Sequence, residues 1–122
     1  EKMQFVNRSE LSILLGNITK SIKAKQVKFQ VYTESLTGKK TLKVTDHNLL
    51  FFDPGASNQD VVLPKEGESK DIIFIIFNTG SGNDLIVKED SETLTIITIS
   101  QNEGGLLVCN GSVWKGFVAG IT

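Results

Sequence analysis

Few side chains in this sequence could do chemistry, and they are not grouped along the chain. His47 is the only histidine and Cys109 the only cysteine, so a catalytic triad or a zinc site within one chain would have to rest on them. His47 lies between Asp46 and Asn48 in a predicted turn, whereas Cys109 lies in an apolar strand pattern. We therefore predict an exposed turn residue and a small buried thiol.

The other candidate motifs lack parts that their chemistry needs. The segment 37–41 has a glycine followed by a lysine, as in a phosphate loop. However, Thr33 stands where that motif needs its first glycine, and Lys40 replaces the hydroxyl residue that would hold magnesium. Carboxylates are spread without the alternating spacing of a calcium loop. The sequence thus predicts a protein that is not an enzyme, with no cofactor and no metal site.

Composition indicates one folded domain without an electrostatic reason to bind nucleic acid or a membrane. Of 122 residues, 39% are apolar and 22% are charged, with a formal net charge of −1. The longest apolar run, Ile72 to Phe77, is far shorter than the roughly 18 residues of a membrane span. A group of N-terminal lysines is interpreted as a solvated helix face. We expect neither nucleic acid nor a membrane as partner.

The N-terminal segment, residues 1–25, predicts an attachment or oligomerisation helix. Ser9 is a suitable N-cap, and apolar residues then recur at spacings of four, three and four. These residues are Leu11, Leu15, Ile18 and Ile22. Because a helix of this length is marginal alone in water, the stripe must pack either on the chain's own β-domain or on copies of itself. Both arrangements stay open.

From residue 26 the apolar period changes to two, which predicts strands. About eight or nine short strands separated by turns favour a mainly β domain over residues 26–122, as an antiparallel β-sandwich or jelly-roll-like barrel. Residues 78–84 are predicted to form a hairpin loop, and Asn110-Gly111 a tight hairpin turn. The apolar phase slips between Ile96 and Ile97, which predicts a β-bulge or a change of sheet.

One strand is apolar at every position from Ile72 to Phe77, so both of its faces should be covered. One face meets the opposite sheet, and either the N-terminal helix or a neighbouring subunit must cover the other. The predicted subunit interface therefore adds Ile73, Ile75 and Phe77 to the helical stripe. Trp114 and Tyr32 could stack on a sugar, but a core or interface position is favoured for Trp114.

The order of several motifs resembles a known family. These motifs lie in residues 61–64, 73–82, 85–87, 92–94 and 107–114. Together they resemble a β-domain of tailed-phage virion proteins, such as head decoration proteins, head fibres and tail-fibre modules, over about residues 41–119. The resemblance implies a homotrimeric structural domain whose N-terminal segment attaches to the particle or bundles near the threefold axis. Cys109 and Lys115 depart from the pattern, and residues 1–40 match nothing in it.

We therefore expect a structural virion protein that decorates the capsid or belongs to a head fibre, as a homotrimer. Its partners would be copies of itself and the major capsid protein or another virion protein. The alternative is a tail-fibre module that binds a receptor or a host-surface glycan. A small hydrolase ranks third, and a cleft that gathers two carboxylates with His47 would favour it.

Overall fold

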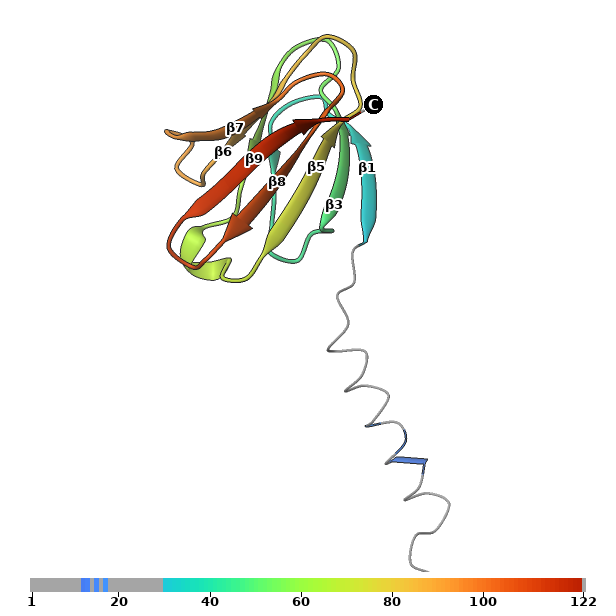
Figure 1. Ribbon diagram of the computed structural model, residues 1–122, viewed down its shortest axis with the longest axis vertical. Coiled ribbons are helices and arrows are strands. Elements are labelled where there is room, and N and C mark those ends of the chain that lie inside the picture. Colours follow the sequence, from blue (N-terminus) through green and yellow to red (C-terminus); the bar gives the residue numbers. More distant parts are fainter. Residues whose placement is uncertain (1–11, 14, 16, 18–29, 122) are drawn as a thin grey trace, which may run out of the picture.

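The computed structural model describes residues 30–121, together with Ser12, Ile13, Leu15 and Asn17 (Figure 1). In this part of the chain the protein is mainly β. The elements are β1 (Val31–Ser35), β2 (Lys40–Thr41), β3 (Leu49–Asp53), β4 (Gln59–Val62), the 3-10 helix η1 (Glu66–Glu68), β5 (Ile73–Asn78), β6 (Leu85–Lys88), β7 (Thr95–Ile99), β8 (Glu103–Cys109) and β9 (Trp114–Gly120).

The strands form two sheets, and the chain alternates between them from β1 to β6. The five-stranded sheet has the order β1-β3-β5-β8-β9, and the four-stranded sheet the order β2-β4-β6-β7. Parallel neighbours need a long crossover, which is usually a helix. Here the crossover between two strands of one sheet contains a strand of the other sheet. The parallel pair β1 and β3, for example, is joined through β2.

The prediction of antiparallel sheets is wrong, because both sheets are mixed. Among the described strands, β1-β3, β3-β5, β2-β4 and β4-β6 pair in parallel. Residues 78–84 are therefore not a hairpin loop, since they lead from β5 in one sheet to β6 in the other. A two-residue period predicts a strand but carries no information on its direction.

Two local predictions are confirmed. β8 and β9 form an antiparallel hairpin at Asn110-Gly111, where Gly111 has a φ of 95° that favours glycine. In β7, Ile97 pairs with Val87 but Thr95 pairs with Lys88, so the ladder skips Ile96. This residue is the β-bulge expected from the slipped apolar phase.

One hydrophobic core contains inward-facing residues of both sheets. Phe52 and Phe74 enter it from the five-stranded sheet, and Val87 from the four-stranded sheet. Trp114 is 1% exposed, its ring stacks on Phe74, and its Nε1 donates a hydrogen bond to the Pro64 carbonyl at 2.9 Å. Of the two positions predicted for Trp114, core or interface, the structure shows the core, and the buried position predicted for Cys109 is confirmed.

The predicted N-terminal helix stays a prediction. Of its apolar stripe only Leu15 is among the described residues, where it has helical backbone and is exposed. Leu11, Ile18 and Ile22 lie outside the described residues, and so does the predicted boundary at residue 25.

Candidate functional site

The five-stranded sheet has an apolar outer face, which we define as the face directed away from the core. Side chains alternate along a strand, so every second residue of β3, β5, β8 and β9 points to this face. On β5, Phe74 and Ile76 are fully buried in the core, whereas Ile73, Ile75 and Phe77 are partly exposed. All three predicted interface residues of β5 therefore lie on the outer face.

An unbroken row of apolar residues crosses this face. The pairing register places one residue from each of the five strands side by side. We call Val31, Leu49, Ile75, Leu106 and Phe117 the apolar row. Its two ends lie on the edge strands β1 and β9 and are more than half exposed, at 57% for Val31 and 62% for Phe117.

A second row next to it carries a pair of stacked aromatic rings. Phe51 of β3 and Phe77 of β5 are neighbours in the register, and their ring centroids are 4.8 Å apart. On the other side of Phe77 the register places Gly104 of β8. A Cβ atom at Gly104 would lie 2.9 Å from Cδ1 of Phe77, so glycine allows this ring to lie close to β8. The two rings extend the apolar surface of the outer face.

The four-stranded sheet has a more polar outer face. Asp60 of β4 and Lys88 of β6 form an ion pair there, with 3.0 Å between Oδ2 and Nζ. Thr98 of β7 is exposed on the same face, beside the partly buried Ile86. This sheet thus shows apolar residues inside and mostly polar residues outside, as expected for a sheet with one solvated face. The five-stranded sheet departs from that pattern.

Sequence reasoning found the β5 part of the outer face and missed the rest. The apolar run at residues 49–52 predicts a strand, but it does not tell which of the two strand faces is covered. The sequence does not tell which strands pair with those of Val31 and Phe117, because pairing between strands far apart in sequence cannot be read from local pattern. The useful signal was the run of apolar residues at 49–52, which is continuous like that at 72–77.

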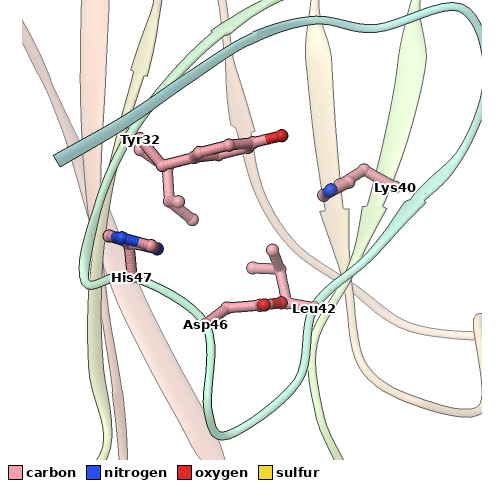
Figure 2. A pocket seen from close by; sticks show the side chains of 6 residues that line it. Tyr32, Lys40, Leu42, Asp46 and His47 are labelled. Atoms are coloured by element: carbon pink, nitrogen blue, oxygen red, sulfur yellow. The ribbon is translucent and has the colours of Figure 1, made fainter. Parts of the chain in front are cut away.

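A separate pocket of about 250 Å³ lies beside the edge strands β1 and β2 (Figure 2). It is lined by Tyr32, Lys40, Leu42, Asp46, His47 and Leu50. The rings of Tyr32 and His47 are stacked, with centroids 5.7 Å apart. The side chains of Tyr32, His47, Asp46, Leu42 and Lys40 surround an open space in Figure 2. His47 is exposed in the turn before β3, as predicted.

Charged groups at this pocket are largely paired. Lys40 Nζ lies 2.8 Å from Glu34 Oε1 and 5.4 Å from the centre of the Tyr32 ring. The hydrogen bond from Lys40 lowers the pKa of Glu34, and the same bond raises the pKa of Lys40. Asp46 Oδ2 accepts a hydrogen bond from the backbone N–H of Lys43 at 2.7 Å, which closes the turn that carries His47.

The pocket brings only part of a hydrolytic constellation together. His47 and Asp46 line it, but a second carboxylate is not among the lining residues. Glu34, whose side chain reaches the lining residue Lys40, is held by it in a hydrogen bond. The condition set for a small hydrolase, two carboxylates in a cleft with His47, is therefore not met by this pocket.

Across the described residues, no group of three or more His, Cys, Asp or Glu side chains is arranged to hold a metal ion. None of the helical residues described there belongs to a helix long and apolar enough to cross a membrane. Comparison of the chain with protein-family models, curated proteins and solved structures gave no match.

Proposed function

We propose that this chain is a structural protein that assembles with copies of itself through the outer face of the five-stranded sheet. The apolar row is the observation that carries the proposal. A sheet with one face in water normally carries polar residues on that face, and the four-stranded sheet follows this rule. The apolar row of the five-stranded sheet does not follow this rule. The pairing register aligns its apolar residues across all five strands.

The size of the outer face indicates how it would be used. The sheet face is five strands wide, at about 4.8 Å per strand, and about five residues long, at about 3.3 Å per residue. Its flat area is therefore roughly 400 Å². A stable interface buries about 800 Å² on each partner. The sheet face alone is thus too small, and a second contribution is needed. The predicted helical stripe of residues 1–25 precedes β1 in the sequence and would supply it.

Identical copies are the occupant that best fits this face. Its rows carry few charges, with Lys115 beside Val108 at one end, so copies that meet here would not place many like charges against one another. In a closed ring of three, the five-stranded sheets would face a common axis. The heptad-like stripe would then bundle on the same axis. We interpret the two sheets of each copy as a β-sandwich.

The place of this assembly is proposed from the motif order in residues 41–119, which resembles the β-domain of tailed-phage virion proteins. On that basis the protein would decorate a capsid or form part of a head fibre. It would bind the major capsid protein or another virion protein. Its role would be structural, since burying apolar surface between subunits needs no catalytic group.

A pair of matched variants tests the proposal. Ile75→Asp places a charge in the centre of the apolar row, and Thr98→Asp places one on the outer face of the four-stranded sheet. Light scattering should give about 40 kDa for the wild type and for Thr98→Asp, three times the 13.4 kDa of one chain. Ile75→Asp should give a mass near one chain, with the β-sheet circular dichroism spectrum retained.

Phe117→Asp is the second variant, because Phe117 lies on the edge strand β9 and is 62% exposed. A charge there disturbs the fold less than one in the middle of the sheet. If Ile75→Asp and Phe117→Asp both keep the wild-type mass, the outer face is not the subunit interface.

A further inference from the structure

We infer that the pocket formed by Tyr32, Lys40, Leu42, Asp46, His47 and Leu50 binds one neutral, hydroxyl-rich ring, such as a single monosaccharide unit. The inference rests on the chemistry and charge of these six side chains. It goes beyond the proposed assembly and does not depend on it.

The dimensions of the pocket suit one small ring. Its volume of about 250 Å³ lies just below the range of roughly 300–1,000 Å³ that is usual for larger organic ligands. Leu42 and Leu50 are buried at 2% and 1% exposure and form an apolar base. Tyr32 is 40% exposed, so part of its ring can contact a ligand. A sugar ring has C–H groups on its faces that pack on such surfaces.

The charges around the pocket argue against a strongly charged ligand. Lys40 is already bound by Glu34, and the charge of Asp46 also acts on it. An anion would have to compete with both carboxylates for this one ammonium group. A cationic ligand would meet the ammonium group itself within the same small space. A neutral ligand avoids both conflicts.

Polar atoms suited to hydroxyl groups remain in the lining of the pocket. Asp46 uses Oδ2 to close its turn, and among the described residues Oδ1 has no hydrogen-bond partner. The ring nitrogens of the exposed His47 likewise have no hydrogen-bond partner in the described part of the chain. A carboxylate oxygen accepts and a neutral imidazole both donates and accepts. Hydroxyl groups both donate and accept, so a ligand that carries several of them can satisfy these atoms together.

The pocket would stay accessible in the proposed assembly. Tyr32 pairs with Leu50 on the core side of the five-stranded sheet, whereas its neighbour Val31 belongs to the apolar row on the outer face. A second copy that covers the outer face would therefore lie on the other side of the sheet from the Tyr32 side chain and would not block the pocket there. Ligand binding and assembly can be measured separately on the full chain.

The sequence offers unusually specific reporters, because Tyr32 is the only tyrosine and His47 the only histidine. Protein labelled with ¹³C at tyrosine and histidine should give one set of ring signals for each. We expect both sets to shift on titration with one of four probes: glucose, galactose, mannose or N-acetylglucosamine. The dissociation constant should be about 1–10 mM, as expected for a ligand of this size. N-acetylneuraminic acid and choline serve as charged probes and should bind at least tenfold more weakly.

Tyr32→Ala and His47→Ala provide the site test, with Thr98→Ala as a control on the outer face of the four-stranded sheet, away from both the pocket and the proposed interface. Each pocket variant should weaken binding at least fivefold in ligand-observed NMR, and the control should not. The mass in light scattering should stay at the wild-type value for all three. The inference is overturned if no neutral probe shifts the Tyr32 and His47 signals at about 100 mM, or if a charged probe binds more tightly. If the protein is monomeric and still binds a neutral probe, the assembly proposal is wrong and the pocket inference stands.

Discussion

The ring of Phe51 on β3 stacks on the ring of Phe77 on β5, with centroids 4.8 Å apart, on the outer face of the sheet. A second aromatic pair, Phe74 of β5 with Trp114 of β9, lies in the core. Aromatic packing therefore occurs on both sides of β5. A stack in the core is expected of any β-domain, whereas a partly exposed stack in the middle of a sheet supports the proposal that another copy of the chain covers this face.

Removing one ring of this stack should weaken assembly without unfolding the domain. Phe77→Ala deletes apolar surface from the outer face but leaves Phe74 and Ile76, its core neighbours, unchanged. We expect the association constant from sedimentation equilibrium to fall at least tenfold, which is about 1.4 kcal/mol. An association constant equal to that of the wild type would show that the Phe51–Phe77 stack lies outside any interface.

A buried asparagine at the end of β5 should matter for stability instead. Asn78 is 3% exposed, and its Nδ2 donates hydrogen bonds to the carbonyls of Asn83 and Ile99 at 2.8 and 2.9 Å. Its Oδ1 accepts one from the backbone N–H of Gly80 at 2.9 Å. Asn78→Ala leaves these groups unpaired, and we expect it to lower the free energy of unfolding by about 2–4 kcal/mol in urea titrations.

The control for this change is Asn58→Ala, which removes one exposed hydrogen bond from the N–H of Asp84. It should lower the free energy of unfolding by about 0.5–1 kcal/mol. Equal effects of the two substitutions would mean that Asn78 does not hold the end of β5 in the way described.

The pair Glu34–Lys40 predicts a small dependence of stability on pH in the acid range. The hydrogen bond from Lys40 lowers the pKa of Glu34 in the folded protein, so the carboxylate stabilises the fold above the pKa of an unfolded glutamate. This contribution is lost as the pH falls through the lower folded pKa. It is below about 1 kcal/mol because the pair is partly exposed.

The variant Glu34→Gln has no carboxylate at this position, so acidification cannot remove the stabilisation that the Glu34–Lys40 pair gives the wild type. Between about pH 6 and pH 3, the urea midpoint of the wild type should therefore fall further than that of Glu34→Gln. At neutral pH the wild type should be the more stable of the two. Parallel pH profiles would show that the ion pair adds nothing to stability.

Local features of this fold could be predicted from the sequence because short-range physics decides them. The turn at Asn110-Gly111 needs a positive φ at the glycine, and the bulge at Ile96 follows from a break in the two-residue period. Strand β3 begins at Leu49, where the apolar run begins. The core position of Trp114 follows from the apolar residues that share its face.

Pairing and direction could not be predicted in the same way. Val31 lies beside Leu49 only because the chain passes through the other sheet and returns, so the contact joins residues far apart in sequence. No local pattern encodes this return. For the same reason the sequence predicts Ile75, in the centre of the apolar row, as an interface residue but does not predict the row as a whole. The pocket combines β1 with the turn at Asp46 and His47, so it too depends on non-local pairing.

We propose that identical copies cover the outer face of the five-stranded sheet. Sedimentation equilibrium of the full chain, at several concentrations and moderate salt, tests it most directly. We expect a particle of about 40 kDa, three times the mass of one chain. A single species of 13.4 kDa at every concentration would contradict it, because the apolar row would then be stable in contact with water.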